Sequence, residues 1–199
     1  PQDAVNIHDV DTVVISTAIH EDNPEVVKAR ELGLPVLHRS EALAAVMGES
    51  QVVAVAGTHG KSTTSSMISV MFDQLGAQPS FAVGTVIAGR GTNAHLGVQG
   101  PESIFVAEAD ESDGSFVRYR PAIAVVNVEP DHLDFYETDE RVFEAFNRFV
   151  GSMAPNGVVV TCADDAGAAA LAARSRAAGV AVVTYGESAD ADLRISEIT

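Results

Sequence analysis

Residues 51–64 read QVVAVAGTHGKSTT, and this stretch is the clearest indication of the fold that the chain is expected to adopt. Gln51 to Ala56 is a continuous apolar, β-branched run, which is typical of a strand buried on both faces of a parallel sheet. A glycine-containing turn, Gly57 to Gly60, leads into Lys61 to Leu75, where apolar residues recur at helical spacing. These residues are Met67, Ile68, Met71, Phe72 and Leu75. The stretch therefore predicts a strand, a loop and an amphipathic helix in succession.

The loop has the composition of a phosphate-binding turn. Glycines at both of its ends let the backbone bend without a Cβ clash, so that successive N–H groups and the helix N-terminus can face phosphate oxygens. Lys61 would place its charge on the β and γ phosphates of a nucleotide, and Ser62 would offer its hydroxyl to Mg²⁺. The residues predicted to bind ATP are Gly57, Thr58, His59, Gly60, Lys61, Ser62 and Thr63.

This loop departs from the full G-x-x-x-x-G-K-[ST] pattern, because Val55 stands where the outer glycine belongs. A shorter G-x-x-G-K-[ST] loop matches instead. The alternative interpretation is a plain glycine-rich turn between a strand and a helix, with an incidental lysine.

Strands and helices are predicted to alternate along the whole chain, which favours an α/β fold with a mostly parallel sheet covered by helices on both faces. A boundary near Gly48 separates two expected units, residues 1–48 and 49–199. The other predicted strands are 13–16, 35–37, 81–83, 104–107, 123–128, 158–161 and 180–184. The other predicted helices are 25–32, 41–47 with Ser40 as N-cap, 139–150 and 165–178.

Composition excludes some classes of protein. The chain carries 28 acidic against 12 basic residues, a net charge of −16, which would repel a nucleic-acid backbone. An anionic small substrate must then be held by backbone N–H groups, single cations or a metal. No window resembles a membrane span, so no membrane partner is expected. The single cysteine, Cys162, allows no intrachain disulfide, which fits a cytoplasmic location.

Polar clusters follow two of the predicted strands. Four acids fall within Glu108 to Asp113, and Glu129 to Asp134 contains His132. Ligands of doubly wound sheets gather at the carboxyl ends of strands, so both clusters should lie beside the phosphate loop. There Glu108 and His132 are candidates for coordinating a divalent ion with phosphate oxygens. The alternative for the first cluster is a solvated acidic loop.

Three segments together resemble the Mur ligase family: GTHGKSTT (57–64), AEADESDGSF (107–116) and NVEPDHLDFY (127–136). The resemblance implies a three-domain, ATP-dependent ligase of peptidoglycan synthesis. Residues 1–48 would be the end of a Rossmann-like domain that binds the UDP-sugar, and residues 49–199 would be most of the P-loop-containing central domain. The C-terminal domain would then be a missing partner of the same polypeptide, and this chain alone is expected to be inactive.

The resemblance also assigns roles to residues. Lys61, Glu108 and His132 correspond to catalytic residues, and Ser62, Glu108 and His132 to ligands of Mg²⁺. Substrate contacts are implied for His59, Thr92, Asn93, Ser16 and Thr17.

The motif details indicate a reaction within the family. His59 and the string EADESD resemble the members that join L-alanine to UDP-N-acetylmuramic acid through an acyl phosphate. The members that attach a recycled murein tripeptide are the second interpretation, since their acidic string carries Tyr where this chain has Ser112. A P-loop kinase or nucleotidase, and a catalytically silent nucleotide-binding module, are the remaining alternatives.

Overall fold

The structure, a computed structural model, describes residues 2–129 and 133–197 and divides into two compact units, Pro1–Val46 and Met47–Thr199. In the first unit, strand β1 (Val13–Ile15) pairs in parallel with β2 (Val36–His38), and helix α1 (Pro24–Glu31) connects them. The side chain of Asn23 caps α1 by accepting a hydrogen bond from the Glu25 N–H at 2.9 Å. A short 3₁₀ helix, η1 (Ala4–Asn6), contacts α1.

Helix α2 (Arg39–Met47) starts earlier than the sequence predicts. Ser40 lies inside its first turn, so the prediction of Ser40 as N-cap was wrong. The backbone N–H of His38 donates a hydrogen bond to Glu41 Oε2 at 2.7 Å. This bond caps the N-terminus of the helix at His38, two residues before Ser40. Ser40 is buried, and its hydroxyl lies 2.7 Å from Nδ1 of His38.

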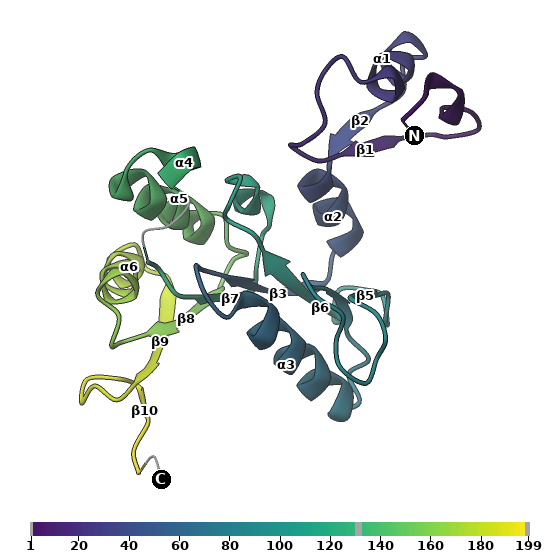
Figure 1. Ribbon diagram of the computed structural model, residues 1–199. Coiled ribbons are helices and arrows are strands. Elements are labelled where there is room, and N and C mark those ends of the chain that lie inside the picture. The colour runs from purple at the N-terminus through teal and green to yellow at the C-terminus, as the bar shows by residue number, and fades with distance from the viewer. Residues whose placement is uncertain (1, 130–132, 198–199) are drawn as a thin grey trace. The chain divides into compact units, whose positions relative to one another are not determined.

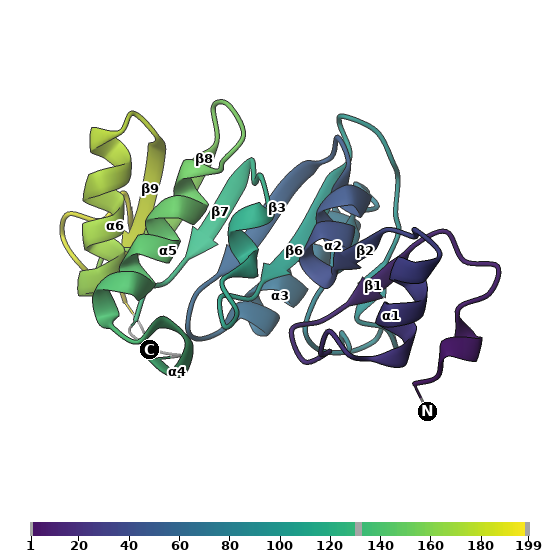
Figure 2. The same ribbon diagram turned by 90° about the horizontal axis from the view of Figure 1, so that it is seen from above.

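The second unit is built on an eight-stranded sheet in the order β10-β9-β8-β7-β3-β6-β4-β5, parallel except for the β4–β5 pair. Helix α3 covers one face, and α5 and α6 cover the other (Figures 1 and 2). The strands are β3 (Gln51–Ala56), β4 (Ser80–Ala82), β5 (Ala94–His95), β6 (Ile104–Ala109), β7 (Ile123–Val126), β8 (Val158–Cys162), β9 (Ala181–Gly186) and β10 (Leu193–Arg194). The helices are α3 (Lys61–Gln74), η2 (Ser115–Arg118), α4 (Leu133–Tyr136), α5 (Asp139–Gly151) and α6 (Ala166–Ala177).

Strand β3 lies between β6 and β7 and is buried from Val52 to Ala56, as its continuous apolar sequence predicts. Its last two residues pair with Glu108 and Ala109 of β6. Strand β6 is therefore two residues longer than predicted, and Glu108 belongs to the strand instead of the loop that follows. The carboxyl ends of β3, β6 and β7 meet at one edge of the sheet.

Only some of the apolar residues that recur along α3 pack into the core. Ile68 and Phe72 do pack against the core residues Val53, Phe81 and Val106, but Met67, Met71 and Leu75 are 67%, 48% and 74% exposed. Ser65 and Ser69 are fully buried, and each hydroxyl donates to the carbonyl four residues earlier at 2.8 Å. Because serine is small and can satisfy its own hydroxyl within the helix, it allows α3 to lie close to the sheet.

On the other face, two aromatic rings of α5 pack with one of η2 in the core. Phe116 of η2 lies with its ring centroid 5.3 Å from that of Phe146 and 4.9 Å from that of Phe149. All three side chains are buried. The hydroxyl of Thr138 caps the helix by accepting from the Arg141 N–H. Burial of these three rings stabilises the packing of α5 against the core.

Gly167 sets how closely α6 approaches the segment that follows β7. A Cβ at this position would lie 2.2 Å from the carbonyl oxygen of Val128 and 2.8 Å from Cε1 of Phe143. We expect Gly167→Ala to lower the free energy of unfolding by about 2 kcal/mol, because the clash exceeds the gain in helix propensity. Gly151→Ala, in α5 with no atom within 4 Å of the new Cβ, is the matched control and should raise it by up to about 1 kcal/mol. Urea denaturation measures both, and equal effects would contradict the prediction.

Candidate functional site

The loop between β3 and α3 is held by Asn127, which follows β7. Its side-chain Nδ2 donates to the carbonyl oxygen of His59 at 2.6 Å, and its Oδ1 accepts from the His59 N–H at 3.4 Å. The hydroxyl of Thr58 donates to the carbonyl oxygen of Glu129 at 2.8 Å. The segment after β7 thus fixes the backbone of the loop. These contacts were not predicted from the sequence.

Both glycines of the loop adopt positive φ angles. Gly57 has φ +130°, and a Cβ on it would lie 2.1 Å from Asn127 Oδ1. Gly60, with φ +75°, is the N-cap of α3 and offers no side-chain hydrogen bond. The N-terminal N–H groups of α3 therefore lack a capping side chain at Gly60, which is the arrangement that suits a bound anion.

Lys61 reaches back across the loop. Its Nζ donates to the carbonyl oxygen of Gly57 and to Glu111 Oε1, at 2.8 Å each. The Lys61 side chain is 15% exposed, and that of Glu111 is 2% exposed. The sequence pointed to the acidic string 108–113 but gave no sign that Glu111 is the carboxylate that turns inward to the lysine.

Ser62 and Glu108 lie together at the start of α3. The Ser62 hydroxyl donates to Glu108 Oε1 at 2.9 Å, and the other carboxylate oxygen accepts from the Gly84 N–H at 2.5 Å. A Cβ on Gly84 would lie 2.9 Å from both oxygens, so the approach requires glycine. Mg²⁺ prefers one or two protein oxygen ligands together with phosphate oxygens and water. The hydroxyl and carboxylate fit that preference.

The remaining residues predicted to bind nucleotide or metal either have exposed side chains or lie outside the described residues. His132 lies outside the described residues. His59 is exposed, with Nδ1 3.8 Å from Glu129 Oε2, and Thr63 is exposed in the first turn of α3. Among residues 2–129 and 133–197, no cluster of three His, Cys, Asp or Glu side chains is arranged to hold a metal ion.

The predicted substrate-side residues make local hydrogen bonds. Asn93 Nδ2 donates to the carbonyl oxygen of Val83 at 3.3 Å, and the Thr92 hydroxyl donates to the carbonyl oxygen of Ala94 at 2.8 Å. Both bonds stabilise the turn that leads from β4 to β5. Ser16 and Thr17 follow β1 in the first unit, and their assignment to the substrate side stays a prediction.

Tyr136, at the end of α4, connects the segment after β7 to the acidic string. Its hydroxyl donates to the backbone carbonyl of Glu111 at 2.5 Å, and the residue is 5% exposed. Burial, reinforced by the negative charge of Glu111, raises the pKa of Tyr136 to about 12 from an ordinary value of 10.0.

This pKa makes stability depend on alkaline pH. Because the folded pKa is raised, the contribution of Tyr136 is complete below pH 10 and is lost as the pH rises through about 12. We expect the wild type to lose about 2 kcal/mol more than Tyr136→Phe over that range in urea denaturation. Identical pH dependence of the two proteins would contradict the assignment.

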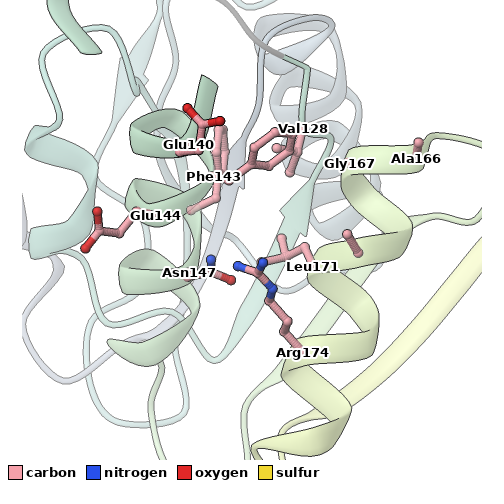
Figure 3. A pocket seen from close by; sticks show the side chains of 11 residues that line it. Val128, Glu140, Phe143, Glu144, Asn147, Ala166, Gly167, Leu171 and Arg174 are labelled. Carbon is pink, nitrogen blue, oxygen red and sulfur yellow. The ribbon is translucent and has the colours of Figure 1, made fainter. Parts of the chain in front are cut away.

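A separate pocket of about 420 Å³ lies between α5 and α6 (Figure 3). Its walls are mostly apolar, with Val128, Phe143 and Leu171 among them, and Arg174 and Glu144 carry charge at its border. No residue predicted to bind nucleotide or substrate lines it. The pocket is thus distinct from the phosphate loop.

Within the described part of the chain, no helix has the length and apolar character needed to cross a membrane.

Comparison with known proteins finds matches over nearly the whole chain. Residues 55–199 match the model of the Mur ligase middle domain, and residues 1–51 match that of the Mur ligase family, catalytic domain. Curated proteins named UDP-N-acetylmuramate–L-alanine ligase are 56% identical in Paenarthrobacter aurescens, over 98% of this chain, and 59% identical in Renibacterium salmoninarum, over 96%. The chain spans 42% and 40% of those relatives' lengths.

Two solved structures are also similar. The UDP-N-acetylmuramate–alanine ligase of Thermotoga maritima has a TM-score of 0.73 at 29% identity, over 94% of this chain and 41% of that one. The ligase of Neisseria meningitidis that joins UDP-N-acetylmuramate to L-alanyl-γ-D-glutamyl-meso-diaminopimelate has a TM-score of 0.80 at 28% identity, over 92% of this chain and 61% of that one.

Proposed function

Because this chain belongs to the Mur ligase family, we propose that it forms the ATP-binding part of an enzyme that joins L-alanine to UDP-N-acetylmuramic acid. The observation that carries the proposal is the junction of β3 and α3, where Lys61, Ser62 and Glu108 surround one glycine-rich loop. The shared name of relatives more than 50% identical to this chain supports the choice of substrates.

The proposed activity belongs to a longer polypeptide. The chain spans about two fifths of the length of the curated relatives. We assign residues 1–48 to the end of the UDP-sugar-binding domain and residues 49–199 to the central domain. A C-terminal domain of the same polypeptide completes the enzyme. Its product enters peptidoglycan synthesis, and we place the reaction in the cytoplasm, where ATP is available.

The first chemical step activates a carboxylate. The lactyl carboxylate of UDP-N-acetylmuramic acid attacks the γ-phosphate of ATP, so that the acyl phosphate forms and ADP leaves. Both reactants are anions, and the protein contributes chiefly positioning and charge neutralisation. Lys61 and the N–H groups of the loop and of the first turn of α3 hold the β and γ phosphates in this step.

The hydroxyl of Ser62 and the carboxylate of Glu108 are the described residues that would hold Mg²⁺, and His132 is the third proposed ligand. Bound there, Mg²⁺ supplies additional positive charge to the phosphate oxygens. The N–H of Gly84 keeps Glu108 directed toward Ser62.

The second step forms the amide. The neutral amine of L-alanine attacks the acyl carbon, the bond to the phosphate breaks, and inorganic phosphate leaves with the proton that the nitrogen gives up. The acyl phosphate hydrolyses if water reaches it first, so the site must be shielded while the amine enters. No side chain forms a covalent bond to substrate in this scheme.

The proposal is tested by measuring ADP formation in the full-length protein with ATP, Mg²⁺ and UDP-N-acetylmuramic acid. L-Alanine and the tripeptide L-alanyl-γ-D-glutamyl-meso-diaminopimelate are supplied in separate reactions. We expect turnover with L-alanine only. Turnover with the tripeptide alone would assign the protein to the recycling ligases, which share its fold. ATP consumption that needs neither acceptor would indicate a nucleotidase.

A further inference from the structure

Glu111 is a buried carboxylate that the proposed reaction scheme does not use. It lies two residues past the end of β6, and its side chain is 2% exposed. A carboxylate is costly to bury unless a cation and further hydrogen bonds compensate for the lost hydration. The cation is Lys61, whose Nζ lies 2.8 Å from Oε1 of Glu111. The buried charge is therefore paired with the lysine of the phosphate loop.

The contacts of Lys61 fix the direction in which its ammonium group points. An ammonium group has three N–H donors, and two of them are engaged by the carbonyl oxygen of Gly57 and by Glu111. One donor is left for a phosphate oxygen at the loop. A lysine restrained in this way loses less side-chain entropy on binding than one that moves freely in solvent, which favours binding of the nucleotide.

Glu111 is held in place through hydrogen bonds to its backbone. Its carbonyl oxygen accepts from the hydroxyl of Tyr136 at 2.5 Å and from the N–H of Gly114 at 2.9 Å. Tyr136 is buried and belongs to α4, so the segment that follows β7 fixes the loop that follows β6. Glu108, three residues earlier, contacts Ser62 instead, and the two acids therefore have different partners.

We propose that Glu111 is a positioning residue for Lys61, which it keeps directed at the β and γ phosphates of ATP. This inference rests on the proposed function, because it assumes that ATP occupies the loop. It adds a residue that acts through the lysine and not by binding nucleotide or metal itself. Tyr136 supports the same arrangement by fixing the backbone of Glu111.

The first test is kinetic. Glu111→Gln in the full-length protein keeps the size of the side chain and an acceptor oxygen but removes the charge that holds the lysine. We expect kcat to fall by on the order of 10²-fold, as for a misplaced catalytic group, while the KM values for L-alanine and the UDP-sugar stay unchanged. Glu102→Gln, an exposed residue before β6, is the matched control and should retain wild-type kinetics. A wild-type kcat in Glu111→Gln would overturn the proposal.

The second test is a double-mutant cycle on the affinity for ATP with Mg²⁺, measured by calorimetry. Glu111→Gln should weaken binding about tenfold in the wild-type background but not in the Lys61→Met background, because the lysine carries the effect. Equal weakening in both backgrounds would show that Glu111 acts by another route and would overturn the proposal. Tyr136→Phe should weaken binding in the same direction and by less.

Folding and the proposed function are checked separately. Thermal melting shows whether each variant folds. If Glu111→Gln does not, Glu111→Asp replaces it, since the shorter side chain keeps the charge but withdraws it from Lys61. The same loss of kcat is then expected, and a wild-type kcat would overturn the proposal. If the wild type binds ATP without ligase turnover, the proposed function fails, and the binding cycle still tests Glu111.

Discussion

Replacing Lys61 with methionine is expected to lower kcat for ADP formation by on the order of 10³-fold. The proposed first step brings two anions together, and Lys61 holds its ammonium group at the phosphate loop, 2.8 Å from the carbonyl oxygen of Gly57. Methionine keeps the length of the side chain and removes the charge. The rate is measured with saturating ATP, UDP-N-acetylmuramic acid and L-alanine in the full-length protein.

Lys28→Met is the matched control for this substitution. Lys28 lies on α1 and forms an ion pair with Glu31 at 3.2 Å, and its side chain is 38% exposed. An exposed pair of this kind contributes less than about 1 kcal/mol, so the rate should not change. If Lys61→Met retains a rate within about tenfold of the wild type, the lysine does not stabilise the charge that develops in the transition state.

Gly57→Ala is expected to lower the free energy of unfolding by about 3 kcal/mol and to abolish measurable binding of ATP. The new Cβ would lie 2.1 Å from Oδ1 and 2.5 Å from the backbone oxygen of Asn127, so the loop or the segment after β7 must move. Either movement breaks the hydrogen bonds between Asn127 and His59. The φ of +130° adds strain, because it is unfavourable for any residue with a Cβ.

Gly76→Ala separates steric overlap from backbone strain. Gly76 follows α3 with φ +81°, and no atom lies within 4 Å of the point that a Cβ on it would occupy. Its replacement should cost only the left-handed conformation, about 1 kcal/mol, and leave binding of ATP intact. Urea denaturation and calorimetry on both variants give the comparison. Equal loss of stability in the two variants would mean that the contact with Asn127 is unimportant.

Much of the fold can be predicted from local sequence. Strand β3 begins and ends at the predicted residues, because an unbroken β-branched run in an α/β chain has few alternatives to a central parallel strand. Helix α5 begins at the predicted Asp139, where Thr138 provides its cap. Four short elements, β5, β10, η2 and α4, were not predicted, since they are too short to show periodicity.

The face of a helix that becomes buried is harder to predict. In α3, Met67, Met71 and Leu75 recur at helical spacing and yet are exposed, whereas Ser65 and Ser69 are fully buried. Helical spacing specifies which residues share a face. How closely the sheet approaches that face decides whether small or large side chains fit against it.

Local sequence is enough to predict the strand–loop–helix unit, the family resemblance and the approximate positions of Lys61, Ser62 and Glu108, because each depends on residue types at fixed spacing along the chain. Which partners these residues take depends on the folded arrangement of the strands. Glu111 contacts Lys61, Asn127 fixes the loop, and Tyr136 supports Glu111 over a separation of 25 residues. Such pairings arise only when β3, β6 and β7 align their carboxyl ends, since the sheet then brings distant segments within hydrogen-bonding distance.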